Sequence, residues 1–252
     1  DWNRASVIIW SIGNETPFSD ARMDFMIDLK ETAEGLDSSR LISAALLSGS
    51  VEQFRSLTYF LAKEGLKHNF ASDYEKAIFK QIVTQLQPLY GSMETFRINI
   101  KDPLAEHLDV IAYNEYFGWY YTSFIVDQLG VEESTLRKLM FNLMPSIKIE
   151  SQYKKPIHLS EFGAGAKRNY KADGGIWSEE YQEDVYRHQL EMIQNNDQIQ
   201  GLSPWILKDF RSMMRPLAGV QDFYNRKGLV DEDGKKKKAF KILRQFYEDD
   251  WE

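Results

Sequence analysis

Two glutamates, Glu15 and Glu161, stand where acidic side chains could do chemistry together. Glu15 ends the apolar run 6–15, Glu161 lies near the end of segment 155–163, and each of these segments resembles a strand. In a parallel α/β barrel the C-terminal strand ends surround one pocket, so acids remote in sequence would face each other. A facing carboxylate pair can cleave a glycosidic bond, one group protonating the leaving oxygen and the other attacking the sugar carbon or activating water. Alternatively, these are simply two of 38 acidic residues, placed where strands often end in polar side chains.

The elements that would position these acids follow a regular alternation. Short segments rich in β-branched and aromatic residues predict five buried parallel strands, and amphipathic stretches predict helices between them. We expect strands over 7–12, 41–46, 108–114, 157–162 and 199–206, and helices over 20–36, 133–143, 178–193 and 237–246. Alternating strands and helices predict an α/β chain built of βα units.

The segment from about 50 to 96 departs from this rhythm. It contains two predicted helices, 51–66 and 72–86, in place of a short connection. Because it follows the C-terminal end of a strand, it would lie on the active-site side of a barrel, as a lid, a subsite wall or an oligomer contact. A helical pair merely packed on the rim fits the sequence equally well.

Five βα units cannot close an eight-stranded barrel, and the first predicted strand begins almost at residue 1. An open half-barrel would expose backbone groups along its edge strands. We therefore expect residues 1–252 to be the C-terminal portion of a barrel domain, with three further βα units upstream in the native polypeptide.

Composition narrows the functions that the chain could have. With 31 basic and 38 acidic residues the formal net charge is -7, so the chain has no cationic excess for a nucleic-acid backbone. No apolar run reaches the roughly 18 residues of a membrane span, and no signal-peptide pattern precedes the first strand. We expect a soluble protein of the cytoplasm or periplasm. Zero cysteines exclude disulfides and thiolate chemistry. Aromatic residues make up 13% of the chain, which favours a carbohydrate partner because rings pack on sugar faces as well as in cores.

The residues around both acids resemble glycoside hydrolase family 2, the group that includes β-glucuronidases and β-galactosidases. Asn14-Glu15 is similar to the Asn-Glu pair that ends the fourth barrel strand of that family, and Glu161 in Ser-Glu-Phe-Gly is similar to its seventh-strand nucleophile. The resemblance implies a (β/α)8 TIM barrel, of which this chain covers about strands 4 to 8 with a helical insertion after strand 5. It also implies a retaining exo-β-glycosidase that forms a covalent glycosyl-enzyme intermediate. Glu15 would be the general acid/base, Glu161 the nucleophile and Asn14 the donor to the sugar 2-hydroxyl.

Two aromatic segments extend the resemblance. Residues 114–120 are similar to the family run Asn-x-Tyr-x-Gly-Trp-Tyr, which implies that Tyr116 hydrogen-bonds the nucleophile while Asn114 and Tyr120 line the sugar site. Trp205 resembles the eighth-strand tryptophan that forms the floor of that site, and we expect a cis peptide bond after it. For Tyr116 and Trp119 the alternative is an aromatic cluster that only seals the barrel mouth.

Asn225-Arg226-Lys227 bears on the choice of substrate. It matches the Asn-x-Lys pattern with which β-glucuronidases hold the uronate carboxylate, a group that galactosides lack. A similar stretch also occurs in relatives that act on neutral sugars, and Gln221 stands where well-studied glucuronidases would have a further basic residue. The first prediction is therefore a β-glucuronidase, the second a β-galactosidase or other neutral β-glycosidase, and the third a non-catalytic fragment. Besides the carbohydrate, upstream domains are expected partners, and a homo-oligomer stays open.

Other conspicuous features predict structure. The acidic stretch 231–234 lacks the ligand pattern of a calcium loop and predicts a turn, and the lysine run 235–238 predicts a solvated start of the last helix. Ser178 has the position of a helix N-cap. The four histidines show no metal-ligand spacing, and His158 is expected to be a packed side chain. No metal or cofactor is predicted.

Overall fold

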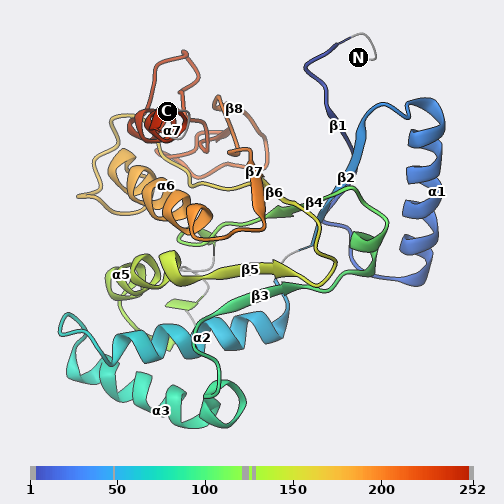
Figure 1. The fold of residues 1–252 in the computed structure, drawn as a ribbon. Coiled ribbons are helices and arrows are strands. Elements are labelled where there is room, and N and C mark those ends of the chain that lie inside the picture. Colours follow the sequence, from blue (N-terminus) through green and yellow to red (C-terminus); the bar gives the residue numbers. More distant parts are fainter. Residues whose placement is uncertain (1–3, 48, 121–124, 127–128, 250–252) are drawn as a thin grey trace.

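The computed structural model describes residues 4–47, 49–120, 125–126 and 129–249. Five parallel strands form the main sheet, in the order β1-β2-β4-β6-β7 (Figure 1). They are β1 Ile9–Asn14, β2 Leu41–Leu46, β4 Val110–Asn114, β6 Ile157–Glu161 and β7 Ile199–Leu202. The five predicted strands are thus confirmed, the second with its predicted bounds and the other four with shifted bounds. The last ends earlier than predicted, because Pro204 has no N–H to continue the ladder.

Helices connect these strands and cover the sheet (Figure 1). They are α1 Asp20–Leu36, α2 Val51–Gly65, α3 Asp73–Tyr90, α5 Glu133–Leu143, α6 Glu179–Gln194 and α7 Lys238–Asp249, with 3-10 turns at Pro103–Glu106 and Met144–Ser146. Serines cap several of the helices, since the side chains of Ser50, Ser72 and Ser178 each accept a hydrogen bond from the first turn. The predicted N-cap at Ser178 is confirmed. None of the helices within the described ranges is long and apolar enough to cross a membrane.

Two small sheets were not predicted. Strand β3 Arg97–Ile100 pairs in parallel with β5 Lys148–Ser151, and β8 Phe210–Arg211 pairs antiparallel with β9 Tyr224–Asn225. Their strands have two to four residues, too few for a periodicity to show in the sequence. The β8–β9 pair matters for the site, because it fixes the segment that carries Asn225.

The segment 50–96 contains the two predicted helices and is more than a surface decoration. Leu57, Phe60 and Leu61 of α2 are buried in the main core. Helix α2 packs against α3 and α5. Gly65 is required at the α2–α3 contact, because a Cβ there would lie 2.4 Å from the ring of buried Phe79. Helix α2 therefore contributes to the main hydrophobic core.

The C-terminal ends of the parallel strands carry the candidate catalytic residues. Glu15 directly follows β1, Asn114 ends β4 and Glu161 ends β6, with Asn114 and Glu161 as register partners. The pairing register shifts between Ser11 and Asn14 and again between Tyr113 and Asn114. Such irregularities re-aim side chains and are common beside active sites.

Candidate active site

One cavity of about 470 Å³ lies among these strand ends. Eight of the nine predicted site residues line it, namely Asn14, Glu15, Tyr116, Tyr120, Glu161, Trp205, Asn225 and Lys227. The ninth, Asn114, is buried and hydrogen-bonds Glu15. Gly49, Phe54 and Arg215 line the cavity as well, although no sequence motif indicated them.

Asn114 links the two acidic strand ends. Its amide nitrogen donates to Oδ1 of Asn14 and to Oε1 of Glu15, both at 3.1 Å. Its amide oxygen accepts a 2.7 Å hydrogen bond from the hydroxyl of Ser160, the residue before Glu161. With all three bonds made by a side chain that is 1% exposed, Asn114 holds Glu15 in a fixed position relative to β6.

Glu161 has a phenol as its partner. The Tyr116 hydroxyl donates a 2.6 Å hydrogen bond to Oε2 of Glu161. Burial raises the pKa of Tyr116, and the hydrogen bond to Glu161 raises it further, so the phenol stays protonated. The protonated phenol therefore holds the Glu161 carboxylate in one orientation in the cavity.

Glu15 has an unusual backbone conformation. Its φ is 51°, in the left-handed region that glutamate rarely adopts, and its N–H donates to the carbonyl of Ala45 at 2.9 Å. A non-glycine residue in this region costs about 1–3 kcal/mol and is concentrated at functional sites. The conformation turns the chain out of β1 at the point where the carboxylate enters the cavity.

A cation lies beside the acids. The Lys227 ammonium donates to the Tyr120 hydroxyl and lies 4.3 Å from the centroid of the Tyr116 ring, and the Lys227 N–H donates to Oδ1 of Asn225 at 3.1 Å. Burial lowers the pKa of Lys227, and the nearby charge of Arg215 lowers it too, whereas Tyr120 and the charge of Glu161 raise it. Lys227 and Asn225 thus form one polar wall of the cavity.

Trp205 forms another wall. Its N–H donates to the carbonyl of Phe162 at 3.0 Å, so the extension of β6 beyond Glu161 holds it in place. The peptide bond between Trp205 and Ile206 is cis, as predicted. A second cavity of about 300 Å³, walled by Trp119 and Trp177, shares Tyr120, Arg215, Asn225 and Lys227 with the first.

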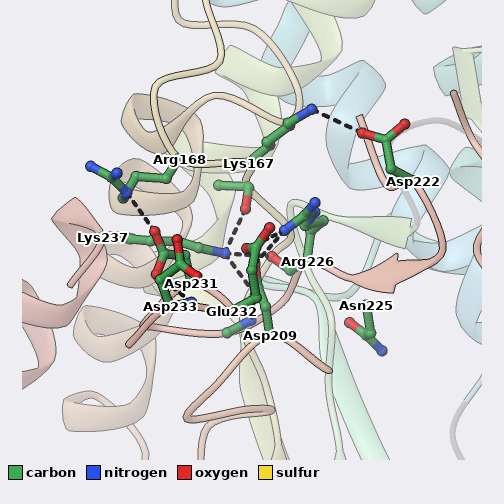
Figure 2. A network of polar contacts seen from close by, with 12 residues as sticks. Lys167, Arg168, Asp209, Asp222, Asn225, Arg226, Asp231, Glu232, Asp233 and Lys237 are labelled. Atoms are coloured by element: carbon green, nitrogen blue, oxygen red, sulfur yellow. Dashed lines mark hydrogen bonds and ion pairs between the residues drawn. The ribbon is translucent and has the colours of Figure 1, made fainter. Parts of the chain in front are cut away.

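A charged network surrounds Arg226, the residue between Asn225 and Lys227 (Figure 2). The Lys237 ammonium donates to Oδ1 of Asp209 at 2.8 Å and to the carbonyls of Ala166 and Arg226 at 2.6 and 3.0 Å. The Lys237 side chain is fully buried, so the prediction of a solvated lysine run is wrong at this position. The reason is that three acceptors meet at one point and satisfy the ammonium completely. The turn predicted at 231–234 is present.

Asp209 completes this network. Its Oδ1 also accepts from the N–H of Gly228 at 2.8 Å, and its Oδ2 lies 3.4 Å from the Arg226 guanidinium, which pairs with Glu232 as well. Burial raises the pKa of Asp209 and lowers that of Lys237, and the attraction between the two charges offsets part of each shift. The network therefore fixes the backbone of residues 226–228, next to Asn225 and Lys227.

Glu115 is a buried acid that sequence reasoning did not single out. It is 1% exposed, its Oε1 accepts from the N–H of Phe117, and its Oε2 has no partner among the described residues. Burial raises the pKa of Glu115 to about 8. Its neighbours Asn114 and Tyr116 reach the site, but Glu115 does not line the cavity.

The histidines take no part in the site. His158 Nε2 lies 2.9 Å from the Ser203 hydroxyl, burial lowers its pKa, and it lines neither cavity. Within the part of the chain that the structure describes, no group of three or more His, Asp or Glu side chains could hold a metal ion.

A parallel α/β sheet whose strand ends bring two carboxylates into one cavity is the arrangement of a barrel glycosidase. The model of the family described as glycosyl hydrolases family 2, TIM barrel domain, matches residues 1–249, and the chain belongs to that family.

Known proteins agree with this assignment at low identity. A putative β-glucuronidase of Formosa agariphila is 24% identical over 98% of this chain and 26% of its own length, and a β-glucuronidase of Paenibacillus borealis is 22% identical over 97% and 31%. The chain therefore spans about a quarter to a third of these relatives.

Solved structures share the fold. The GH2 β-galacturonidase from Eisenbergiella tayi bound to galacturonate has a TM-score of 0.62 and 22% identity, covering 98% of this chain and 34% of that one. The β-glucuronidase of Dictyoglomus thermophilum has a TM-score of 0.58 and 22% identity, covering 97% of this chain and 32% of that one.

Proposed function

We propose that this chain carries the catalytic pair of a retaining exo-β-glycosidase that acts on β-uronides. The substrate that we expect it to prefer is a β-glucuronide. The observation that carries the proposal is the single cavity lined by Glu15, Glu161, Asn225 and Lys227. The two candidate catalytic acids and the two candidate carboxylate-binding residues therefore line the same cavity, which is large enough for one sugar ring.

In the first half of the reaction, Glu161 attacks the anomeric carbon as an ionised carboxylate. The hydrogen bond from Tyr116 holds the carboxylate in position before the attack. Glu15 gives its proton to the glycosidic oxygen, so the aglycone leaves as a neutral alcohol while the sugar becomes covalently bound to Glu161.

In the second half, Glu15 acts as a base. It takes a proton from water, the water oxygen attacks the anomeric carbon, and the bond to Glu161 breaks, which regenerates both carboxyl groups in their starting states. Asn114 keeps Glu15 in position through both steps, and its bond to Asn14 Oδ1 leaves the Asn14 amide nitrogen to donate to a sugar hydroxyl.

Lys227 and Asn225 would select the uronide. A uronate carboxylate accepts charge-assisted hydrogen bonds from the Lys227 ammonium and a further bond from the Asn225 amide, whereas a neutral hydroxymethyl group leaves the ammonium without a counter-charge. Tyr120 orients Lys227 for this contact, and Trp205 offers an aromatic wall for the apolar face of the sugar.

We further propose that the five parallel strands correspond to strands 4 to 8 of the family barrel, with α2 and α3 in the connection after strand 5. The order β1-β2-β4-β6-β7 and the acids at the ends of its first and fourth strands support this numbering. The activity of the whole protein rests on the same proposal, because the chain covers only part of its relatives.

A panel of nitrophenyl glycosides tests the proposal. We expect turnover of the β-glucuronide to exceed that of the β-galactoside and β-glucoside, measured on this chain and on the longest natural polypeptide that contains it. The β-galacturonide is the second substrate to test, since the Eisenbergiella tayi structure holds galacturonate. Proton NMR of the first-formed product should show the β-anomer, as retention requires. Turnover confined to neutral sugars would contradict the uronide assignment, and an α-anomer would contradict retention.

A further inference from the structure

The cations around segment 225–228 fall into two groups. Arg226 pairs with Asp209 and Glu232, and Lys167 pairs with Asp222 at 2.9 Å (Figure 2). Among the residues that the structure describes, by contrast, no carboxylate lies within ion-pair distance of Lys227 or of Arg215. These two cations are also the only basic side chains that line the cavity of Glu15 and Glu161 in the described part of the chain.

Arg215 is held at this place by the backbone of the β8–β9 connection. Its N–H donates to the Ser212 carbonyl at 3.1 Å, and its carbonyl accepts from the Phe223 N–H at 2.9 Å, two residues before Asn225. The half-buried side chain lines both cavities. Its charge acts on Lys227, because Arg215 is one of the groups that lower the Lys227 pKa.

We propose that Arg215 is a second cation for the uronate carboxylate, closing a clamp with Lys227 and Asn225. This assignment rests on the proposed function and extends it to a specificity-determining residue outside the Asn-x-Lys motif.

Electrostatics explain why the clamp selects an anion. Arg215 and Lys227 repel each other in one partly desolvated cavity, and a bound carboxylate attracts both of them. Glu161 lines the same cavity and also attracts Lys227, so the uronate adds to an attraction that is already present. The guanidinium can bind a carboxylate through two parallel hydrogen bonds, whereas the ammonium acts as a point charge. A neutral sugar leaves the repulsion in place, so the same pair of residues both favours a uronide and disfavours a galactoside.

Calorimetric titration of the free sugars tests this role without requiring turnover. Glucuronate and glucose are titrated into the wild type, Arg215→Gln, Arg215→Lys and the control Arg211→Gln. Arg211 is an exposed arginine of β8 that lies over the Tyr224 ring and lines neither cavity. We expect Arg215→Gln to weaken glucuronate binding by about 10- to 100-fold, the range for a lost hydrogen bond to a charged group. Glucose binding should not change, Arg215→Lys should keep part of the affinity, and Arg211→Gln should bind as the wild type does.

The outcomes separate this inference from the proposed function. Unchanged glucuronate affinity in a folded Arg215→Gln, or a wild type that binds glucuronate no better than glucose, overturns the clamp. Equal losses for glucuronate and glucose also overturn it, because they indicate a general effect on the cavity. Arg215-dependent glucuronate binding in a protein that hydrolyses no nitrophenyl glycoside supports the clamp while the proposed function fails. A matched thermal melt of each variant shows whether it is folded.

Discussion

The charged side chains on the two sides of segment 225–228 differ in whether a partner of opposite charge lies beside them. Arg226 points into the network of Asp209 and Lys237, where each charge has a partner, while Lys227 lines a cavity in which no described carboxylate pairs with it. Successive residues of an extended segment point to opposite sides, so one short stretch serves both purposes. The paired charges therefore hold the segment in place, whereas the Lys227 ammonium is available to a ligand.

The two arrangements also differ in how far the free energy of desolvating the charges is compensated. A buried ion pair is expensive to desolvate and is stable only when hydrogen bonds satisfy it fully, as the three acceptors of Lys237 do. Lys227 instead has a phenol and two aromatic faces as neighbours, which leave much of its desolvation uncompensated. Breaking the first arrangement should therefore cost stability, and breaking the second should cost function.

We expect the largest effect from a substitution in the cavity, and we expect it on turnover. Glu161→Gln should lower turnover of the nitrophenyl glucuronide by about 10³-fold or more, because the amide cannot form the covalent intermediate. Its melting temperature should stay within a few degrees of the wild type. Glu248→Gln, at an exposed glutamate paired with Arg244, serves as the matched control and should keep full activity. Substantial residual turnover in Glu161→Gln would remove the nucleophile assignment.

The next largest effect is expected from a substitution in the charged network, and it concerns stability. Asp209→Ala should lower the free energy of unfolding by about 3–5 kcal/mol, because it leaves the buried Lys237 ammonium without a counter-charge. Urea denaturation measures this loss. The double variant Asp209→Ala with Lys237→Met should recover most of the stability, since it removes both charges. A double variant no more stable than the single one would mean that Asp209 acts mainly through Gly228 and Arg226.

A smaller effect, on substrate preference, distinguishes the cavity side of segment 225–228 from the network side most directly. Lys227→Ala should reduce kcat/KM about 10- to 100-fold more for the nitrophenyl glucuronide than for the galactoside, because it removes a charge-assisted bond that only the uronide makes. Unlike Asp209→Ala, it should leave the free energy of unfolding nearly unchanged, since no partner charge is stranded. Equal kinetic losses on both substrates would contradict the uronide assignment.

How far the sequence predicted this molecule depended on the range of the interactions involved. The parallel strands and the acids at their ends could be predicted from local patterns, because a strand and the residue that follows it are neighbours in the sequence. The short β3–β5 and β8–β9 pairs depend on partners far along the chain. Lys237 reads as one of four consecutive lysines, and only the folded chain brings Asp209 and the carbonyls of Ala166 and Arg226 around it.

The site shows the same division. Asn14, Glu15 and Glu161 belong to recognisable runs, whereas Arg215 lies in a connection without a motif and reaches the cavity through the turn between β8 and β9. Phe54 likewise comes from the first turn of α2, where it follows the ordinary spacing of an amphipathic helix. Glu115 carried no signal at all, because a single acid next to a strand end is indistinguishable from a solvated one until its burial is known.

The smallest expected effect concerns Glu115, a buried carboxyl that has no cationic partner among the residues described. Its pKa is raised from the ordinary 4.5 to about 8, so between these values the native state binds one proton more than the unfolded state. Stability must therefore fall as pH rises through this window, by about 1.4 kcal/mol per pH unit from this one group. Urea denaturation at pH 6 and 7 measures that slope, and Glu115→Gln, which cannot ionise, should remove it. An identical pH dependence in the wild type and Glu115→Gln would show that Glu115 is already ionised in the folded protein.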